Sequence, residues 1–545
     1  MTSGHSRSFF GYDPHSISAS QTATGVRCDH DYRTEATGVA DMFTFCDPLK
    51  RALQIGADRI ALLDEDAQFS FTEFAQRCSR LVGGLRGLGL QSGDRVAILA
   101  ANSHRYIETY FAVPAGGLVI VPLNTRHADP EVRYALHDSG ARVLITDRDP
   151  APFADLVQHV VCIGDEYESL LDSAHPWPLG DGVTENDLAG LFYTGGTTGA
   201  SKGVMLTHRN LIANTYHWLL TAPQTDRERV LVMAPLFHAA GSNGVLANIW
   251  TGGCQVPLGA FEPGRALDLI QRHGITATLG VPTMLAAIAE EQLARPRKVD
   301  SLRLIAHGGS PIATEIIRRT HMAFPGAEMV EVYGATELSP LATAQMGEQN
   351  LIDDPRARSC GRAMIGCDIR IFDPNGVELA RGEVGEVVVR GANVMLGYWN
   401  KPEQTAAVLR DGAYWTGDLG YMDDEGFLFL VDRSKDMIVT GGENVYSTEV
   451  EEVLYRHLAV LEAAVFGVPD DRWGEAVHAV VVLRANFGNV DPDEIIAFCR
   501  QHIAGYKVPK SIDLRAEPLP KSGPGKVLKR ELRAPFWAGR DRSVG

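Results

Sequence analysis

Apolar residues recur along this chain in short runs, separated by segments with helical periodicity. In the first third of the chain, strands are expected at 95–100, 119–122 and 143–146, with helices at 103–114 and 129–138 between them. Strands that alternate with helices imply a mostly parallel sheet whose faces are covered by those helices. The pattern therefore predicts an α/β protein.

The segment before these strands predicts a helix, a hairpin and a second helix. We expect the first helix at 47–56 and the paired strands at 61–63 and 69–71. The segment 72–88 predicts an amphipathic helix, with Thr72 as its N-cap and Gly89 at its end. Its apolar stripe consists of Phe74, Cys78, Leu81, Leu85 and Leu88.

The same alternation returns in the middle of the chain. Strands are expected at 230–233, 254–257, 277–280 and 302–307, and helices at 244–250, 265–273, 282–292 and 311–324. Two α/β runs separated by a glycine-rich segment predict two sheets packed together.

The last third of the chain has a different pattern. Short strands at 369–372, 386–390 and 427–431 lie among turn residues and predict a small β subdomain. A helix at 447–456, strands at 460–468 and 476–483 and a helix at 491–502 then predict a short α+β unit. We therefore expect a loosely ordered extension at 1–40, a large domain at 41–432, a hinge at 433–436 and a C-terminal domain at 437–545.

A glycine- and threonine-rich segment divides the two α/β runs. The strand 191–193 leads into Thr194, Gly195, Gly196, Thr197, Thr198 and Gly199, and Lys202 precedes a second apolar run at 204–206. Glycines let the backbone approach an anion closely, and amide groups, hydroxyls and a lysine can bind phosphate oxygens. The spacing of Lys202 does not fit a Walker A loop. The segment predicts a phosphate-binding loop of another kind.

Composition narrows the class of protein. The chain has 545 residues, of which 45% are hydrophobic and 22% charged, and its formal net charge of -17 argues against a nucleic-acid partner. Eight scattered cysteines without a CxxC spacing indicate mostly buried free thiols and no metal cluster. We see no signal peptide and no apolar stretch near the ~20 residues of a membrane span, so the predicted localisation is cytoplasmic.

Six further clusters carry candidate chemistry, although each also has an ordinary explanation as a tight turn, a helix cap, a linker or an exposed lysine. His238, Ala239 and Gly241 follow a strand, and so do Gly308, Gly309 and Ser310. Tyr333 offers a stacking face and Glu337 a hard oxygen ligand for Mg²⁺. Asp418 lies in a predicted turn, and a charged run from Asp432 to Asp436 precedes Gly441 and Gly442. Lys526 lies in a glycine–proline loop.

In combination and in this order, these clusters resemble the adenylate-forming superfamily, which contains acyl-CoA synthetases, adenylation domains and luciferases. The stretches YTGGTTGASKG, DRSKDMIVTGGENVYSTEVE and GKVLKRELR are similar to those of fatty-acid–CoA ligases. The resemblance implies a large domain of two packed α/β sheets plus a β-barrel, followed by a small mobile α+β domain. It also implies ATP, Mg²⁺ and CoA as co-substrates, with acyl-AMP as the intermediate.

The resemblance also implies a role for each residue. Thr194 to Gly199 and Lys202 would bind the pyrophosphate part of ATP, Thr336 the α-phosphate and Glu337 the Mg²⁺ ion, and Lys526 would bridge the carboxylate and the α-phosphate. Adenosine would be bound by Gly309, Ser310, Tyr333, Gly334, Asp418 and Arg433. The acyl pocket would contain His238, Ala239, Gly241, Gly308 and Gly309. Lys435 would be the hinge, and Gly441, Gly442 and Glu443 would line the CoA tunnel.

Several alternatives stay open at this point. Pro524 stands where a Thr or Ser usually precedes Gly-Lys, so an enzyme that performs only one half-reaction is a second hypothesis. A luciferase-like oxidase and a silent acid-binding protein are less favoured. The small residues of the acyl pocket argue against acetate, but they do not choose between a fatty acid and a bulky aromatic or polycyclic acid. A homodimer is also left open.

Overall fold

A computed structural model describes most of the chain. The described residues are 43–65, 67–194, 201–310, 312–352, 354–433, 437–440, 443–470, 472–484, 487, 490–521 and 527–538. The predicted extension at 1–40 lies outside them, and the predicted domain boundaries stay a prediction.

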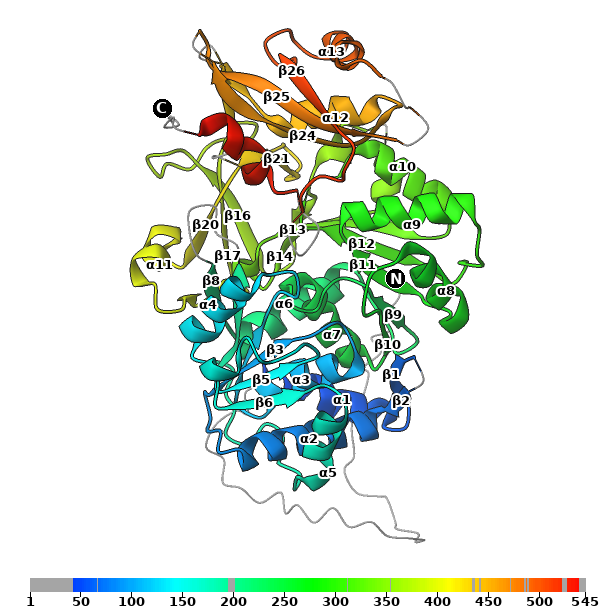
Figure 1. The fold of residues 1–545 in the computed structure, drawn as a ribbon, viewed down its shortest axis with the longest axis vertical. Coiled ribbons are helices and arrows are strands. Elements are labelled where there is room, and N and C mark those ends of the chain that lie inside the picture. The colour runs from blue at the N-terminus through cyan, green and yellow to red at the C-terminus, as the bar shows by residue number, and fades with distance from the viewer. Residues whose placement is uncertain are drawn as a thin grey trace, which may run out of the picture. The chain divides into compact units, whose positions relative to one another are not determined.

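The first α/β run forms a seven-stranded sheet in the order β18-β8-β7-β4-β3-β5-β6. Its strands are β3 (Arg95–Leu99), β4 (Val119–Pro122), β5 (Val143–Thr146), β6 (His159–Cys162), β7 (Leu188–Thr194), β8 (Lys202–Thr207) and β18 (Gly397–Tyr398). Strands β3, β5 and β6 lie side by side in Figure 1. The associated helices are α2 (Phe71–Gly87), α3 (His104–Ala115), α4 (Asp129–Ser139) and α5 (Asp165–Ser173). Strands β3 to β7 pair in parallel, whereas β7, β8 and β18 pair antiparallel.

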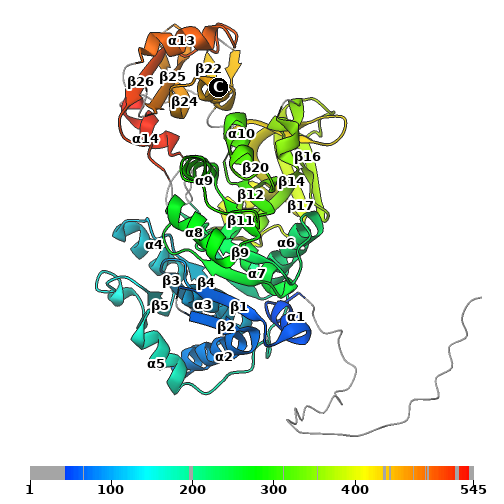
Figure 2. The ribbon, with the colours of Figure 1, turned by 90° about the vertical axis from the view of Figure 1, so that its right-hand side faces the viewer.

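The second α/β run forms a nine-stranded sheet in the order β15-β14-β13-β12-β11-β9-β10-β1-β2. Its strands are β1 (Ile60–Asp64), β2 (Ala67–Ser70), β9 (Arg229–Val232), β10 (Cys254–Pro257), β11 (Ala277–Gly280), β12 (Leu304–Gly308), β13 (Glu328–Gly334), β14 (Leu341–Met346) and β15 (Arg362–Ala363). Helices α8 (Pro263–His273), α9 (Pro282–Ala294) and α10 (Thr314–Ala323) lie beside it (Figure 2). The predicted hairpin at 61–71 is thus the edge of this sheet.

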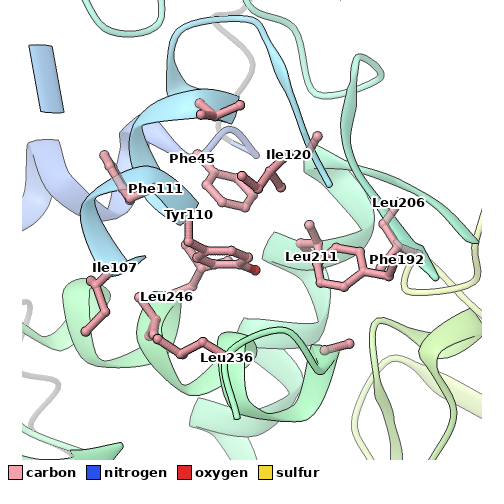
Figure 3. Close-up of a cluster of buried hydrophobic side chains, with 14 of the residues drawn as sticks. Phe45, Ile107, Tyr110, Phe111, Ile120, Phe192, Leu206, Leu211, Leu236 and Leu246 are labelled. Atoms are coloured by element: carbon pink, nitrogen blue, oxygen red, sulfur yellow. The ribbon is translucent and has the colours of Figure 1, made fainter. Parts of the chain in front are cut away.

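One large core cluster joins the two sheets. Helices α1 (Cys46–Gly56), α3, α6 (His208–Thr221) and α7 (Ala239–Thr251) contribute apolar side chains to it, together with strands of both sheets. Phe45, Tyr110 and Phe111 pack there with Leu211 and Leu246 (Figure 3). The sequence prediction of two packed α/β sheets is confirmed.

Two smaller sheets follow. An antiparallel sheet contains β16 (Cys367–Phe372), β17 (Gly385–Gly391), β19 (Leu409–Arg410), β20 (Ala413–Met422) and β21 (Leu428–Arg433), and this is the predicted β subdomain. The C-terminal sheet contains β22 (Ile438–Thr440), β23 (Glu443–Val445), β24 (Val460–Asp470), β25 (Gly474–Leu483) and β26 (Ser511–Arg515). It is accompanied by α12 (Ser447–Arg456), α13 (Pro492–Arg500) and α14 (Lys529–Arg533).

The predicted cap of helix α2 is wrong. Helix α2 begins at Phe71, and Ser70 is its N-cap: the Ser70 hydroxyl accepts a hydrogen bond from the Glu73 amide, and Glu73 accepts one from the Ser70 amide. The Thr72 hydroxyl instead donates to the Ala57 carbonyl at 3.1 Å. The observed N-cap therefore lies two residues before the predicted one.

The structure also bears on the predictions about the cysteines and about membrane-spanning helices. Seven cysteines are described and all are free, and five of these are buried, which agrees with the predicted thiols. Among the described helices, none is long and apolar enough to cross a membrane.

Candidate active site

The predicted phosphate-binding segment lies between β7 and β8. Thr194, the last residue of β7, pairs with Lys202, the first residue of β8. Residues 195–200, with Gly195, Gly196, Thr197, Thr198 and Gly199, lie outside the described residues. The pairing places both ends of the segment next to each other.

Lys202 lies against a tyrosine that the sequence analysis did not single out. Its ammonium nitrogen is 4.5 Å from the centre of the Tyr398 ring. The Tyr398 hydroxyl donates a hydrogen bond of 2.7 Å to Oε1 of Glu337. Burial raises the pKa of Tyr398 well above its usual value, and the neighbouring Glu337 adds to this, so the phenol stays protonated.

Glu337 is positioned by the turn that follows β13. Strand β13 ends at Gly334, and a 3₁₀ helix at Thr336–Leu338 follows. A Cβ on Gly334 would lie 1.9 Å from the Pro340 carbonyl oxygen, so only glycine fits this turn. The structure thereby places Thr336 and Glu337 at the C-terminal end of a strand, where open α/β sheets bind ligands.

Residues that are predicted to bind adenosine lie on three strands. Tyr333 on β13 donates a 2.8 Å hydrogen bond to Oδ2 of Asp418 on β20, and Asp418 pairs with Arg433 at the end of β21. Burial raises the pKa of Tyr333 far above its usual range, with Asp418 adding to the effect. The structure describes the backbone of Arg433 but not its side chain.

Gly308 and Gly309 end the neighbouring strand β12. Gly308 pairs with Val332 on β13, and a Cβ there would lie 2.2 Å from the Val332 carbonyl oxygen. Gly309 has a φ of +83°, which side chains rarely adopt, and a Cβ there would lie 4.0 Å from Cγ1 of Val281. Gly308 is therefore required by close strand packing and Gly309 by its backbone conformation, and the half-buried Ser310 follows them.

His238 lies just before helix α7. Its Nδ1 accepts a 3.4 Å hydrogen bond from the Ala240 amide, so it caps the helix. Ala239 is buried, and a Cβ on Gly241 would lie 2.4 Å from the Pro235 carbonyl oxygen. Packing explains the small size of these two residues without reference to a ligand.

Gly244 is a pocket candidate that the sequence analysis missed. It lies one turn after Ala240, both residues are half-buried, and a Cβ on Gly244 would meet no atom within 4 Å. The i, i+4 spacing of two small residues was the available signal. This face of α7 has room beside it.

The remaining predicted residues belong to the C-terminal part of the chain. Lys526, Lys435, Gly441 and Gly442 lie outside the described residues. Glu443 begins β23 and is exposed. The structure thus groups the predicted nucleotide residues of the large domain but does not place Lys526 among them.

The donor set at Glu337 suits a magnesium ion bound together with a nucleotide. Within the described ranges, no group of three or more His, Cys, Asp or Glu residues could hold a metal on its own. Mg²⁺ typically takes one or two carboxylates and completes its shell with phosphate oxygens and water. The single carboxylate of Glu337, which shares its neighbour Tyr398 with Lys202, fits that requirement.

Comparisons with known proteins agree with this arrangement. The family model for AMP-binding enzymes matches residues 49–399, and the model for their C-terminal domain matches 449–526. A feruloyl-CoA synthase of Amycolatopsis sp. is 41% identical over 90% of this chain and 98% of its own length. A long-chain-fatty-acid–CoA ligase of Bacillus subtilis (strain 168) is 34% identical over 87% of this chain and 91% of its own.

A solved structure gives the same result. O-succinylbenzoate coenzyme A synthetase from Bacillus subtilis, in complex with ATP and a magnesium ion, superposes with a TM-score of 0.80. The two chains are 31% identical, and the match covers 89% of this chain and 98% of the solved chain.

The fold, the site and these matches define an ATP-dependent, AMP-forming acid–thiol ligase. The chain belongs to the AMP-binding enzyme family, within the acyl-CoA synthetases of the adenylate-forming superfamily. The predicted co-substrates ATP, Mg²⁺ and CoA are confirmed for this class. The identity of the acid and the role of each site residue are separate questions.

Proposed function

We propose that this acyl-CoA ligase activates a bulky carboxylic acid, and that an arylpropenoic acid of the ferulate kind is the first candidate. The observation that carries the proposal is the 41% identity to feruloyl-CoA synthase across nearly the whole of both chains. A second candidate, a medium- or long-chain fatty acid, is favoured by the 34% identity to the Bacillus subtilis ligase.

The wall of helix α7 supports a large acid. In the proposal, His238 lies at the mouth of the acyl pocket, with Ala239, Gly241, Gly308 and Gly309 around it. The open space beside Gly244 extends this pocket along the helix. An acetyl group would leave that space unfilled. A larger acid would gain about 0.8 kcal/mol of binding free energy for each CH₂ group that it buries there.

The first half-reaction must bring two anions together. The acid's carboxylate oxygen attacks the α-phosphorus of ATP, and pyrophosphate leaves. We assign the phosphates to Thr194–Gly199 and Lys202, the α-phosphate to Thr336, and Mg²⁺ to Glu337. Lys526 would neutralise the developing charge between the carboxylate and the phosphate.

The adenosine part would be bound at the strand ends. Tyr333 would stack on the adenine, with Gly309, Ser310 and Gly334 along its edge. Asp418 and Arg433 would bind the ribose hydroxyls. The bond between Tyr333 and Asp418 supports this assignment, because it fixes the carboxylate beside the proposed adenine position.

The second half-reaction transfers the acyl group. The CoA thiolate attacks the acyl-AMP carbonyl carbon, a thioester bond forms, and AMP leaves. We assign the pantetheine path to Gly441, Gly442 and Glu443, and the hinge that exposes it to Lys435.

A panel of acids assayed for each half-reaction tests the proposal. Ferulate, a medium-chain fatty acid, a long-chain fatty acid and acetate are each supplied with ATP and Mg²⁺, and pyrophosphate release is measured with and without CoA. We expect ferulate to give the highest kcat/KM and to yield feruloyl-CoA. A fatty acid in first place would favour the second candidate.

The same assay addresses the one-half-reaction alternative. Pyrophosphate release without thioester formation would point to a different acyl acceptor, such as a carrier protein. Thioester formation only from supplied acyl-AMP would point to a defective first step.

A further inference from the structure

Tyr398 contacts two residues to which the proposed function gives roles in binding ATP: Lys202 at the phosphates and Glu337 at Mg²⁺. Its ring faces the Lys202 ammonium group at 4.5 Å, and its hydroxyl donates to Glu337 at 2.7 Å. The side chain is 5% exposed, so both contacts are shielded from water.

The hydroxyl bond sets the orientation of the proposed metal ligand. Because it engages Oε1 of Glu337, it fixes the rotation of the carboxylate and directs the second oxygen away from Tyr398. Side chains that hydrogen-bond to a metal ligand typically change metal affinity or activity by about 10–100-fold when they are removed.

The ring contact holds the lysine at the end of the phosphate loop. A cation over an aromatic face is attracted by the ring quadrupole, and the attraction strengthens when water is excluded. Lys202 is half-buried and begins β8, so this contact restricts where its ammonium group can lie.

The backbone around Tyr398 is fixed from both sides. The amide of Leu396 donates to the Met205 carbonyl at 3.0 Å, and the amide of Trp399 donates to the Gly203 carbonyl at 2.8 Å. On the other side, the amide of Met395 donates to the Glu337 carbonyl at 2.9 Å. The short strand β18 therefore connects the phosphate hairpin directly to the turn that carries Glu337.

We propose that Tyr398 is a positioning residue that orients Glu337 for Mg²⁺ and Lys202 for the pyrophosphate of ATP. The proposal rests on the proposed function for the roles of Glu337 and Lys202. The Tyr398 hydroxyl contacts Glu337 and the Tyr398 ring contacts Lys202. Loss of the hydroxyl and loss of the ring therefore have different consequences.

Two substitutions separate these consequences. Tyr398→Phe keeps the ring and removes the hydroxyl, so we expect the Mg²⁺ concentration for half-maximal pyrophosphate release to rise about 10–100-fold. Tyr398→Leu also removes the ring, so we expect in addition a rise of about two- to thirtyfold in KM for ATP.

A direct binding measurement complements the kinetics. Mn²⁺ is used as a paramagnetic substitute for Mg²⁺, and its binding in the presence of a non-hydrolysable ATP analogue is followed by electron paramagnetic resonance. We expect Tyr398→Phe to weaken Mn²⁺ binding by the same factor. Thioester formation from supplied acyl-AMP and CoA, which involves neither Mg²⁺ nor pyrophosphate, should keep its wild-type rate.

Tyr193→Phe is the matched control. The Tyr193 hydroxyl donates a 2.7 Å hydrogen bond to Asp138, a carboxylate that is not assigned to the nucleotide. We expect this variant to leave Mn²⁺ affinity unchanged.

Three outcomes would overturn the proposal: wild-type Mn²⁺ affinity in Tyr398→Phe, an equal loss in Tyr193→Phe, or an equal loss in thioester formation. If the wild-type protein releases no pyrophosphate with any acid, the proposed function fails, and Mn²⁺ binding still decides the role of Tyr398.

Discussion

At the scale of single residues, glycine is required in this chain for two distinct reasons, and the sequence alone does not tell them apart. Gly334, Gly308 and Gly241 each lie against a backbone carbonyl, whereas Gly309 has a φ of +83° that side chains rarely adopt. The sequence analysis assigned the small residues at 241, 308 and 309 to the acyl pocket together. Gly244 has neither cause, so among these glycines its small size is the one that packing and backbone conformation leave unexplained.

Gly334→Ala tests the packing explanation. The added Cβ would lie 1.9 Å from the Pro340 carbonyl oxygen, so the turn after β13 must shift. We expect a destabilisation of about 1–3 kcal/mol, seen as a lower melting temperature in thermal unfolding. Gly326→Ala is the control, because its Cβ would meet nothing within 4 Å. Equal melting temperatures for the two variants would contradict the explanation.

His208 makes stability depend on pH. The side chain is fully buried, its Nδ1 accepts a 3.2 Å hydrogen bond from the Phe45 amide, and burial lowers the pKa of His208 to about 4. Below the unfolded pKa of about 6.5, the unfolded chain binds a proton that the folded chain does not, so stability falls as pH decreases from 6.5 toward 4.

The expected loss between pH 7.5 and 5.5 is about 1.4 kcal/mol for this group. Urea unfolding of the wild-type protein and of His208→Gln at both pH values measures it, since glutamine does not titrate. The wild type should lose more stability than the variant over this interval. A parallel fall in both proteins would show that His208 does not contribute.

At the scale of elements, the sequence predicted where helices and strands lie better than it predicted their end residues and their contacts. Helix α2 was expected at 72–88 and spans Phe71–Gly87, because its apolar residues repeat with helical spacing. Its cap was assigned to Thr72, although Ser70 followed three residues later by Glu73 is the signature of a capping box. That signal was present in the sequence and was overlooked.

Ser70→Ala tests the observed cap. The Glu73 amide would lose its acceptor, so we expect helix α2 and the core it packs on to lose about 1 kcal/mol, measured as a lower urea midpoint. Ser70→Thr keeps a hydroxyl and should stay close to the wild type. A larger loss in Thr72→Ala than in Ser70→Ala would restore the original assignment.

Tyr398 could not have been predicted from local pattern. Its two partners, Lys202 and Glu337, lie far away in the sequence, and its strand contains only two residues. Periodicity reports which residues share a face of one element, but it carries no information on which distant elements meet. His238 and Gly308 were singled out because they follow predicted strands, and no strand was predicted immediately before Tyr398.

At the scale of the whole molecule, the proposed reaction needs two arrangements of the C-terminal part of the chain. The predicted catalytic Lys526 and the predicted hinge Lys435 lie outside the described residues, and their roles stay predictions. In the proposed function, Lys526 acts only while acyl-AMP forms, and the CoA path is used only afterwards. Substitutions at the two positions should therefore slow different half-reactions.

Lys526→Ala should lower pyrophosphate release by about 10²–10³-fold, since one preorganised donor at a developing charge is lost. Lys435→Pro, which fixes φ, should leave pyrophosphate release intact and slow thioester formation. Both rates are measured separately, with the exposed Lys510→Ala as the control. If Lys435→Pro slows both half-reactions equally, the hinge assignment is wrong.

Strand β18 has a consequence for the synthesis of the protein. It covers the outer edge of β8, and it is made roughly 190 residues after β8 has been completed. At a translation rate of about 5–20 residues per second, the emerging hairpin waits about 10–40 s for its edge strand. During that interval β8 presents unpaired amide and carbonyl groups, which is the surface that pairs with other nascent chains in aggregation. Because β18 is the last strand to join the first sheet, the unpaired edge of β8 is a site where a chaperone can bind during translation.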